Sequence, residues 1–253
     1  MEQVRNQLLR PLLKWRILDL EGLQQELTYQ VPLMTLYKHL VDFEKEGVVV
    51  SKNVLRDRRK YFYLSNLGLE RLGHKKSLGL IDEFFTHDLK VTQVVRQLLR
   101  SPNFTDVKFE NELGTGTFIP DSELKFNYKE RTLILSLEME LSRKSKERIL
   151  SKAEFYLSSS YYDLVLYIFP SHSLMRSYYK VFQEKLGSGF NQKLLLMANE
   201  NLMAMNFDLA EAKGFYQGHE VLLGNVFPIK KTSEKLEKIE KMNFSSLPTP
   251  QNA

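Results

Sequence analysis

Residues 118–141 read FIPDSELKFNYKERTLILSLEMEL, and they decide the fold predicted for this chain. Two runs of strand-like composition flank a polar turn within this stretch. If the hairpin is centred between Lys129 and Glu130, residues whose numbers sum to 259 face each other. Asp121 and Glu138 satisfy that relation, so their side chains are expected on one face of the hairpin, with Cβ atoms about 4.5–5.5 Å apart.

A third carboxylate extends this pair. Glu140 follows Glu138 by two residues and therefore shares its face of the strand. Three carboxylates on one face repel each other unless a cation lies among them. Mg²⁺ favours carboxylate and water oxygens, and a bound divalent ion polarises a phosphodiester and lowers the pKa of its water. Asp121, Glu138 and Glu140 are therefore candidate ligands of Mg²⁺ or Mn²⁺ in a phosphodiester-cleaving site.

A helix is predicted at residues 141–160, leading into a buried strand at 164–169. Arg148, Lys152 and Tyr156 occur at i, i+4 and i+8 and form one stripe of that helix. A lysine in this stripe can point back at the carboxylates. There it would orient a nucleophilic water or stabilise the charge of the transition state.

Three further side chains near this site admit two interpretations each. His87, on a predicted helix at 81–100, fits either a hydrogen bond at the seam between helix and sheet or a place beside the metal or a DNA phosphate. Glu110 is either an exposed residue of a strand edge or an outer ligand. Tyr156 is either a covalent nucleophile or a packing or DNA-contacting residue. The five histidines form no His-x-His pair, which disfavours the class of relaxases that uses a tyrosine and a histidine triad.

The excess positive charge of the chain lies in its first third. Residues 1–76 hold 14 Lys and Arg against 9 Asp and Glu, whereas the rest holds 22 of each, and the net charge is +5. Such asymmetry indicates that the first third binds a polyanion.

The same third has the element order of a winged helix-turn-helix. Apolar spacing, Pro32, Gly47 and Ser65 mark the boundaries of its helices. The predicted order is three helices at 3–15, 20–27 and 32–46, strands at 48–50 and 61–64, and a helix from 66 to 72.

In this arrangement the third helix enters the major groove, and the hairpin tip reaches phosphates or the neighbouring minor groove. A basic hairpin can also be a merely solvated turn, but four of the five residues 56–60 are cationic. The candidate DNA-binding residues are Thr35, Tyr37, Lys38, His39, Lys52, Arg56, Arg58, Arg59 and Lys60. A winged helix used for dimerisation or protein contact is the alternative.

Together these residues resemble a known family. The order of the motifs resembles the PD-(D/E)xK nucleases, and more specifically the replication-relaxation family, which includes MobC-type plasmid mobilisation relaxases. The resemblance covers roughly residues 10–170 and rests on His87-Asp88, Pro120-Asp121, Glu138-x-Glu140, Lys152 and Tyr156. It implies a winged helix joined to a restriction-endonuclease-like core, with Asp121 and Glu138 as metal ligands, Glu140 as a ligand or water-orienting base, and Lys152 stabilising charge.

One position departs from the nuclease pattern. The third motif position normally holds lysine, and here it is Glu140. Lys152 replaces that lysine from the next helix, as in some branches of the superfamily, or else the core binds DNA without cutting it.

The expected fold class is α+β, with an N-terminal winged helix-turn-helix and a restriction-endonuclease-like mixed sheet flanked by helices. The expected division is a DNA-binding domain at 1–76, a nuclease-like domain at 81–230, and a charged segment with a disordered tail at 231–253. The chain has no cysteine and no apolar run of about 18–20 residues, so disulfides, cysteine chemistry and membrane insertion are not expected. A cytoplasmic protein fits this composition.

The expected function is a sequence-specific relaxase or nicking endonuclease that acts with Mg²⁺ or Mn²⁺ on double-stranded DNA. Its site is an origin of a plasmid or mobile element, used in conjugative mobilisation or replication initiation. Relaxosome or coupling proteins, and a second copy in a homodimer, are further candidate partners. The first alternative is a transcription regulator or relaxosome accessory protein with an inactive nuclease-like core. The second is a winged-helix protein with an oligomerisation domain.

Overall fold

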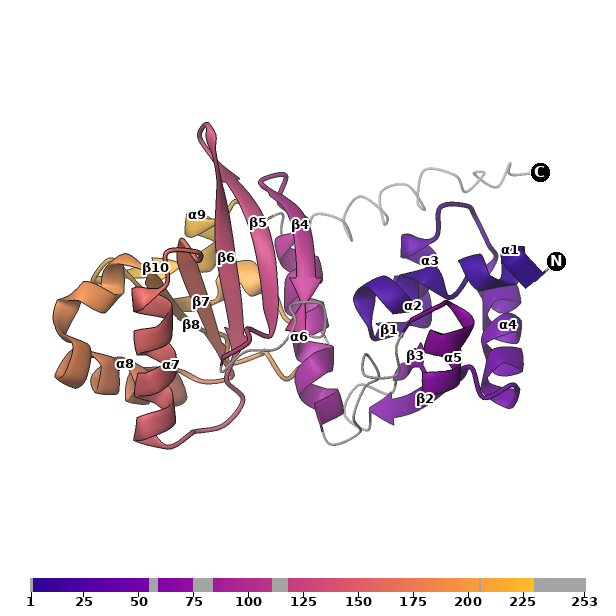
Figure 1. The fold of residues 1–253 in the computed structure, drawn as a ribbon, viewed down its shortest axis with the longest axis horizontal. Coiled ribbons are helices and arrows are strands. Elements are labelled where there is room, and N and C mark those ends of the chain that lie inside the picture. Colours follow the sequence, from indigo (N-terminus) through magenta and orange to yellow (C-terminus); the bar gives the residue numbers. More distant parts are fainter. Residues whose placement is uncertain (1, 55–58, 75–83, 111–117, 205, 230–253) are drawn as a thin grey trace, which may run out of the picture.

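The computed structural model describes residues 2–54, 59–74, 84–110, 118–204 and 206–229. An N-terminal module packs against one side of helix α6 (Phe85–Leu98), and a large sheet packs against the other side (Figure 1). The apolar core is continuous through this helix, since one buried cluster contains Trp15 of the module, Val94 of α6 and Leu135 of the sheet. The expected domain boundary at 77–80 lies outside the described residues.

The N-terminal module combines short helices with a small antiparallel sheet of order β1-β3-β2. Its elements are α1 (Glu2–Gln7), α2 (Arg10–Trp15), β1 (Leu18–Asp19), α3 (Leu20–Glu26), α4 (Leu33–Lys45), β2 (Val49–Val54), β3 (Arg59–Leu64) and α5 (Asn66–Arg71).

The helix ends of this module follow local rules. The Asp19 carboxylate accepts a hydrogen bond from Gly22 N at 2.8 Å and caps α3, and Ser65 Oγ accepts from Gly68 N at 3.0 Å and caps α5. Gly47 has a φ of 71° directly after α4, in the left-handed region that ends helices at glycine. The predicted boundaries of α3, α4 and α5 are therefore confirmed to within a few residues. The helix expected at 3–15 is two helices, α1 and α2, and the two-residue strand β1 was not predicted.

The second part is α+β, with a mixed sheet of seven strands in the order β10-β9-β8-β7-β6-β5-β4. Strands β6, β7 and β8 are parallel, and the other neighbours are antiparallel. Its elements after α6 are β4 (Phe104–Phe109), β5 (Ser122–Tyr128), β6 (Arg131–Met139), α7 (Lys146–Ser158), β7 (Leu164–Phe169), α8 (His172–Leu186), η4 (Gly187–Gln192), β8 (Leu194–Ala198), η5 (Leu209–Glu211), β9 (Lys213–Tyr216), β10 (His219–Leu222) and α9 (Leu223–Val226).

Helices cover both faces of this sheet. Helix α6 packs on one face, where Leu135, Leu137 and Met139 of β6 join the large core cluster. Helices α7 and α8 cover the opposite face over a second cluster that includes Tyr156 and Tyr167 (Figure 1). The alternate residues of β6, Glu138 among them, point to this α7–α8 face because side chains alternate along a strand.

One expected helix boundary in this part is wrong. Residues 141–145 precede α7 instead of beginning it, because Ser145 Oγ caps the helix by accepting from Arg148 N at 3.3 Å. Strand β9 was not predicted. The predicted tail at 231–253 lies outside the described residues. No helix in the described part of the chain is both long and apolar enough to cross a membrane.

Candidate functional site

The hairpin of β5 and β6 has the register that the sequence predicts. Ser122 pairs with Leu137 and Tyr128 with Arg131, so paired residue numbers sum to 259. Lys129, at the turn, takes a φ of 54°. The predicted pairing of Asp121 with Glu138 does not form, because the regular register ends at Ser122 and Leu137. Asp121 N instead donates to Leu137 O at 3.1 Å, so Asp121 lies at the same open end of the hairpin as Glu138 but not directly opposite it.

Glu138 is the most deeply buried of the candidate carboxylates, with a residue exposure of 1%. Both of its oxygens are bonded by side chains of α7. Lys152 donates to Oε2, and the fully buried Tyr156 hydroxyl donates to Oε1. Because Lys152 and Tyr156 are four residues apart, one face of α7 delivers both.

Lys152 also reaches the second glutamate. Its Nζ lies 3.9 Å from Glu140 Oε1, and the other Glu140 oxygen accepts a hydrogen bond from the Tyr178 hydroxyl of α8 at 3.1 Å. Glu140 N donates to Ile168 O at 3.0 Å, which fixes the glutamate at the edge where β6 and β7 end. The ammonium of Lys152 thus lies between two carboxylates.

Asp121 is held from two sides. Its Oδ2 accepts from Met139 N at 2.6 Å and lies 3.4 Å from His87 Nε2. The other imidazole nitrogen, Nδ1, lies 3.2 Å from Asp88 Oδ1. Asp88 Oδ2 in turn accepts from Arg16 Nη2 at 2.9 Å. A chain of charged groups therefore joins the N-terminal module to Asp121.

The pKa values of these groups respond to burial and to one another. Burial raises the pKa of the Glu138 carboxyl to about 8, and it also raises the pKa of Glu140. Burial works to lower the pKa of Lys152, but the charges of Glu138 and Asp121 outweigh it and hold that pKa above its usual range. Lys152 is therefore cationic at neutral pH.

His87 and Asp121 shift each other in opposite directions. Burial works to lower the pKa of His87, but hydrogen bonds to Asp121 and Asp88 and their charges raise it to about 10. Burial works to raise the pKa of Asp121, but the hydrogen bond and charge of His87 outweigh it and lower that pKa. The two side chains form an ion pair at neutral pH, which agrees with the interpretation of His87 as a residue of the helix–sheet seam and also places it beside the candidate site.

The donor set suits a hard divalent cation, although no ready-made ligand cluster is present. Within the described ranges, no group of three or more His, Asp or Glu side chains is placed to hold a metal ion together. Asp121, Glu138 and Glu140 nevertheless supply the oxygen chemistry that Mg²⁺ and Mn²⁺ take. The fully buried Tyr167, paired in register with Glu138, has a hydroxyl without a hydrogen-bond partner in the described part of the chain. A metal-bound water would satisfy it.

The remaining core candidates, Arg148, Tyr156 and Glu110, differ in exposure and contacts. Arg148 is exposed on the first turn of α7, and Tyr156 is 0% exposed with its hydroxyl bonded to Glu138. This burial favours packing over a role as nucleophile for Tyr156. Glu110 is exposed, and its N donates to Asp121 O at 3.1 Å, so it lies at the same end of the sheet.

The N-terminal candidates lie on two elements. On α4, Thr35, Tyr37 and Lys38 are exposed and His39 is half-buried. On the hairpin, each described cation contacts its own module or α6. Arg59 pairs with Asp19 at 2.6 Å, Lys60 pairs with Glu44 at 2.7 Å, and Lys52 lies over the Phe85 ring at 4.9 Å. Arg56 and Arg58 lie outside the described residues. Tyr37, Arg59 and Lys60 line one pocket of about 270 Å³.

Sequence reasoning missed several groups at the carboxylate site. Tyr178 and Arg16 reach it from distant parts of the chain, and no local pattern indicates their contacts. Asp88 was named beside His87, but its bond to Arg16 was not predicted. A local signal did exist for the segment before α7, because Ser145 is a typical N-cap. Three exposed cations, Arg143, Lys144 and Lys146, lie in this segment or at the first residue of α7. The charge of Lys144 acts on Glu140.

Comparisons with protein-family models, with curated proteins and with solved structures find no match for this chain.

Proposed function

We propose that this protein is a DNA-binding, metal-dependent nicking endonuclease of the relaxase type, acting at an origin of a plasmid or mobile element. The observation that carries the proposal is the position of Lys152, whose ammonium lies between Glu138 and Glu140 at the end of β6. Asp121 and Lys152 also act on each other electrostatically, and all three carboxylates lie at the same edge of the mixed sheet as Lys152. Phosphodiester cleavage with a divalent ion uses this combination of groups.

The proposal explains how the site can work without a lysine at the third position of the nuclease motif. Glu140 stands where the nuclease pattern has lysine, and Lys152 of α7 brings an ammonium to within 3.9 Å of Glu140 Oε1. An ammonium has three donors. Contacts to Glu138 and Glu140 leave one donor for a phosphate oxygen or for the attacking water. Lys152 thereby stabilises negative charge as the phosphodiester is attacked.

A bound Mg²⁺ or Mn²⁺ would supply Lewis-acid polarisation of the phosphodiester and a water of lowered pKa. Asp121 and Glu138 would hold it, with Glu140 as a further ligand or as the base that takes a proton from the water. Met139 N and His87 orient the Asp121 carboxylate. Tyr156 and Tyr178 orient Glu138 and Glu140 in the same way.

The surface around the site also suits a polyanion. The segment before α7 and the first turn of that helix carry four exposed cations, Arg143, Lys144, Lys146 and Arg148. The charge of Lys144 acts on Glu140. Positive side chains near a phosphodiester-cleaving site neutralise phosphates and retain the strand. They also offset the repulsion between DNA and the carboxylate cluster.

The N-terminal module is proposed to be a winged helix-turn-helix that recognises double-stranded DNA. Helix α4 follows a short turn after α3 and presents Thr35, Tyr37 and Lys38 to solvent. The antiparallel pair β2–β3 follows α4 as the wing. A winged helix places the exposed residues of such a helix against base edges in the major groove. Relaxosome or coupling proteins, and a homodimer, are further partners consistent with this function.

The test is nicking, with Mg²⁺ or Mn²⁺, of a supercoiled plasmid that carries the origin found beside the gene for this protein. We expect Asp121→Asn, Glu138→Gln and Lys152→Ala each to lower the nicking rate at least about 100-fold. Two matched controls retain the wild-type rate: Glu123→Gln alters a buried glutamate of the same sheet, bonded to Tyr161 at 3.0 Å, and Lys185→Ala alters an exposed lysine of α8. Binding of that DNA without nicking under either metal contradicts the proposal.

A second candidate function is DNA binding by a protein with an inactive core, as in a transcription regulator or accessory factor. The observation that favours it is that the candidate carboxylates are already bonded within the chain, Glu138 by two side chains. It predicts a hydroxyl-radical footprint that persists in EDTA and is unchanged by Asp121→Asn or Glu138→Gln. A footprint that requires Mg²⁺ and disappears in those variants excludes it.

A further inference from the structure

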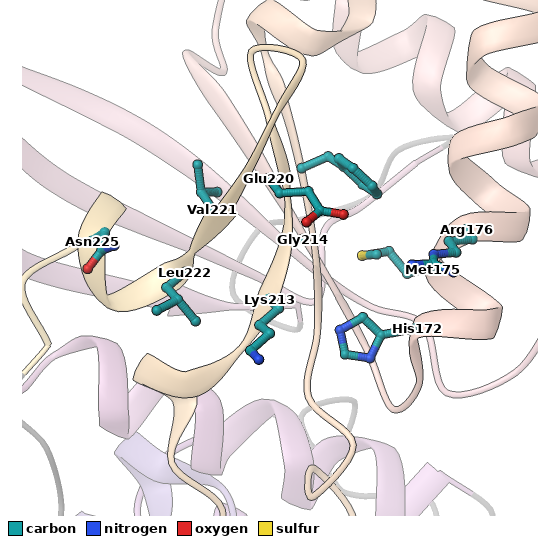
Figure 2. A pocket seen from close by; sticks show the side chains of 10 residues that line it. His172, Met175, Arg176, Lys213, Gly214, Glu220, Val221, Leu222 and Asn225 are labelled. Carbon is teal, nitrogen blue, oxygen red and sulfur yellow. The ribbon is translucent and has the colours of Figure 1, made fainter.

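A pocket of about 600 Å³ lies between the first turns of α8 and the β9–β10 hairpin (Figure 2). His172 begins α8 directly after β7, and Lys213 opens β9 opposite Ala198 at the end of β8. The pocket therefore opens at the edge where the parallel strands end, which is also the edge that carries Glu140. Ligands of sheets with parallel strands commonly bind at this edge.

The pocket also lies on the same face of the sheet as the carboxylate cluster. Met175 and Phe215, which line it, pack in the core cluster under α7 and α8. Three strand spacings separate β6 from β9, which corresponds to about 14 Å. A DNA strand rises about 3.4 Å per nucleotide along the helix axis, so a strand crossing this edge spans that distance with about four nucleotides.

The lining combines cations with apolar walls. Arg176, Lys213 and His172 line the pocket together with Met175 and Phe215. Phe215 is a firm wall because its ring packs against Tyr179 at 4.6 Å. In the described part of the chain, no carboxylate lies within ion-pair distance of Arg176 or Lys213, whereas His172 Nδ1 bonds to Glu200 at 2.8 Å. Two cations thus remain available to a ligand.

These features select the chemistry of the ligand. Arginine and lysine bind phosphate, and arginine does so with a fork of paired donors. A bare phosphate leaves the apolar walls without a partner, while a nucleobase covers them and bonds to the Glu220 carboxylate in the same pocket. We propose that the pocket binds one nucleotide unit, its phosphate on Arg176 and Lys213 and its base against Met175 and Phe215.

The nucleotide can belong to a DNA strand or be free in solution. Arg176, Lys213 and Glu220 are all exposed, so the pocket is open on one side. Sites for free small molecules generally bury most of the ligand, whereas grooves for single strands stay open along the chain. The strand is therefore the expected source, about four nucleotides from the phosphodiester that is cut; this placement rests on the proposed function.

The test measures binding of a fluorescein-labelled 12-nucleotide single strand by the full chain, in EDTA, by fluorescence anisotropy. The pocket variant is Arg176→Ala/Lys213→Ala. The matched control, Lys180→Ala/Lys185→Ala, removes the same charge from exposed positions of α8 outside the pocket. We expect the pocket variant to bind at least about fivefold more weakly, with a salt slope smaller by about 0.7 because the contact to one phosphate is lost. The control should stay within twofold of wild type.

Equal affinities of the pocket variant and the control overturn the inference. Competition with a deoxynucleoside monophosphate separates the two sources. If it displaces the strand only at concentrations at least about 100-fold above the dissociation constant of the strand, the ligand is a strand. If the monophosphate binds with the same affinity as the strand, and the pocket variant no longer binds the monophosphate, the pocket binds a free nucleotide.

The nicking assay, run in parallel, separates this inference from the proposed function. Strand binding that depends on Arg176 and Lys213 in a protein that never nicks supports the pocket and contradicts the nuclease. Nicking by a protein whose pocket variant binds like the control contradicts the pocket alone.

Discussion

Arg16 of the N-terminal module donates to Asp88 of α6 across 2.9 Å, between Nη2 and Oδ2. Both side chains are largely buried, with exposures of 11% and 8%. Asp88 in turn contacts His87, and His87 contacts Asp121. If the proposed function is right, the module that reads DNA and the residue that holds the metal ion are three contacts apart. Helix α6 carries both His87 and Asp88, and both parts of the molecule pack on this helix.

Removal of Arg16 should destabilise the whole chain. A broken buried pair typically costs about 3–5 kcal/mol, and we expect about 2–3 kcal/mol for Arg16→Ala because His87 still balances Asp88. Arg16 also has a φ of 64°, an unfavourable value for a residue other than glycine, so Arg16→Gly should recover about 1 kcal/mol of that loss. Urea unfolding of both variants measures these differences.

The control for that measurement is Arg5→Ala, which breaks a partly exposed pair with Glu46 of 2.6 Å. Such a pair contributes at most about 1 kcal/mol. A loss no larger for Arg16→Ala than for Arg5→Ala would show that the buried pair does not join the two parts energetically.

The contacts of Asp121 and Glu138 show what a local pattern can predict. Strand pairing has a period of two residues, and a two-residue turn at Lys129 and Glu130 fixes the register, so the sequence alone places the two carboxylates at one end of the hairpin. The stripe of Lys152 and Tyr156 is equally local, because helix geometry puts residues four apart on one face. Both contacts to Glu138 follow from these two rules.

The rest of the site depends on packing between distant segments. Tyr178 follows Glu140 by 38 residues and Asp88 follows Arg16 by 72, so neither contact has a local signature. Where β9 and β10 join the sheet likewise depends on how the chain returns after β8. The helix start at Ser145 is a different case, since Ser145 is a typical N-cap and gives a local signal for the beginning of α7.

His87 should make stability depend on pH in the alkaline range. Its pKa is about 10 in the folded chain and about 6.5 in the unfolded chain, so the folded state binds more protons between these values. The stabilisation is fully present below about pH 6.5 and is lost as the pH rises through 10. Urea midpoints measured from pH 6 to pH 10 should fall for the wild type and fall less for His87→Gln. The exposed His219→Gln serves as control, and parallel curves for all three proteins would contradict the assignment.

Glu138 gives a second, separable pH dependence in metal-free protein. The pKa of Glu138 is about 8 in the folded chain, above its ordinary value of 4.5, so the folded state binds the Glu138 proton more tightly than the unfolded state does. The resulting stabilisation of the folded state is complete below about pH 4.5 and is lost as the pH rises through 8. Glu138→Gln keeps a neutral side chain at all pH values and should be more stable than wild type at pH 9. Glu123→Gln should show no such crossover. A destabilised Glu138→Gln at pH 9 would mean that the charged carboxylate is well compensated by Lys152.

Addition of Mg²⁺ or Mn²⁺ should offset the loss of stability that the wild type shows as the pH rises through the pKa of Glu138. A ligand at 100 times its dissociation constant stabilises the folded state by about 2.7 kcal/mol, and the gain should grow with pH because a ligating Glu138 must lose its proton. Asp121→Asn and Glu138→Gln should lose the gain, and Glu123→Gln should keep it. The measurement is the melting temperature with and without metal at pH 7 and pH 9. Equal gains in all four proteins would place the metal elsewhere.

Helix α4 supplies a test of DNA recognition that is independent of the core. Lys38 is exposed near its beginning and Lys45 is exposed in its last turn. If α4 enters the major groove through its first turns, Lys38→Ala should weaken duplex binding and reduce the salt slope by about 0.9, the value for one lost phosphate contact. Lys45→Ala removes the same charge from the same helix and should change neither quantity. Anisotropy titrations of an origin duplex at salt concentrations between about 50 and 200 mM measure the affinity and the salt slope. Over this range the affinity of a protein with six or more phosphate contacts falls about a thousandfold or more. Equal effects of the two substitutions would indicate a general electrostatic attraction to the module, and a loss confined to Lys45→Ala would reverse the proposed orientation of α4 on DNA.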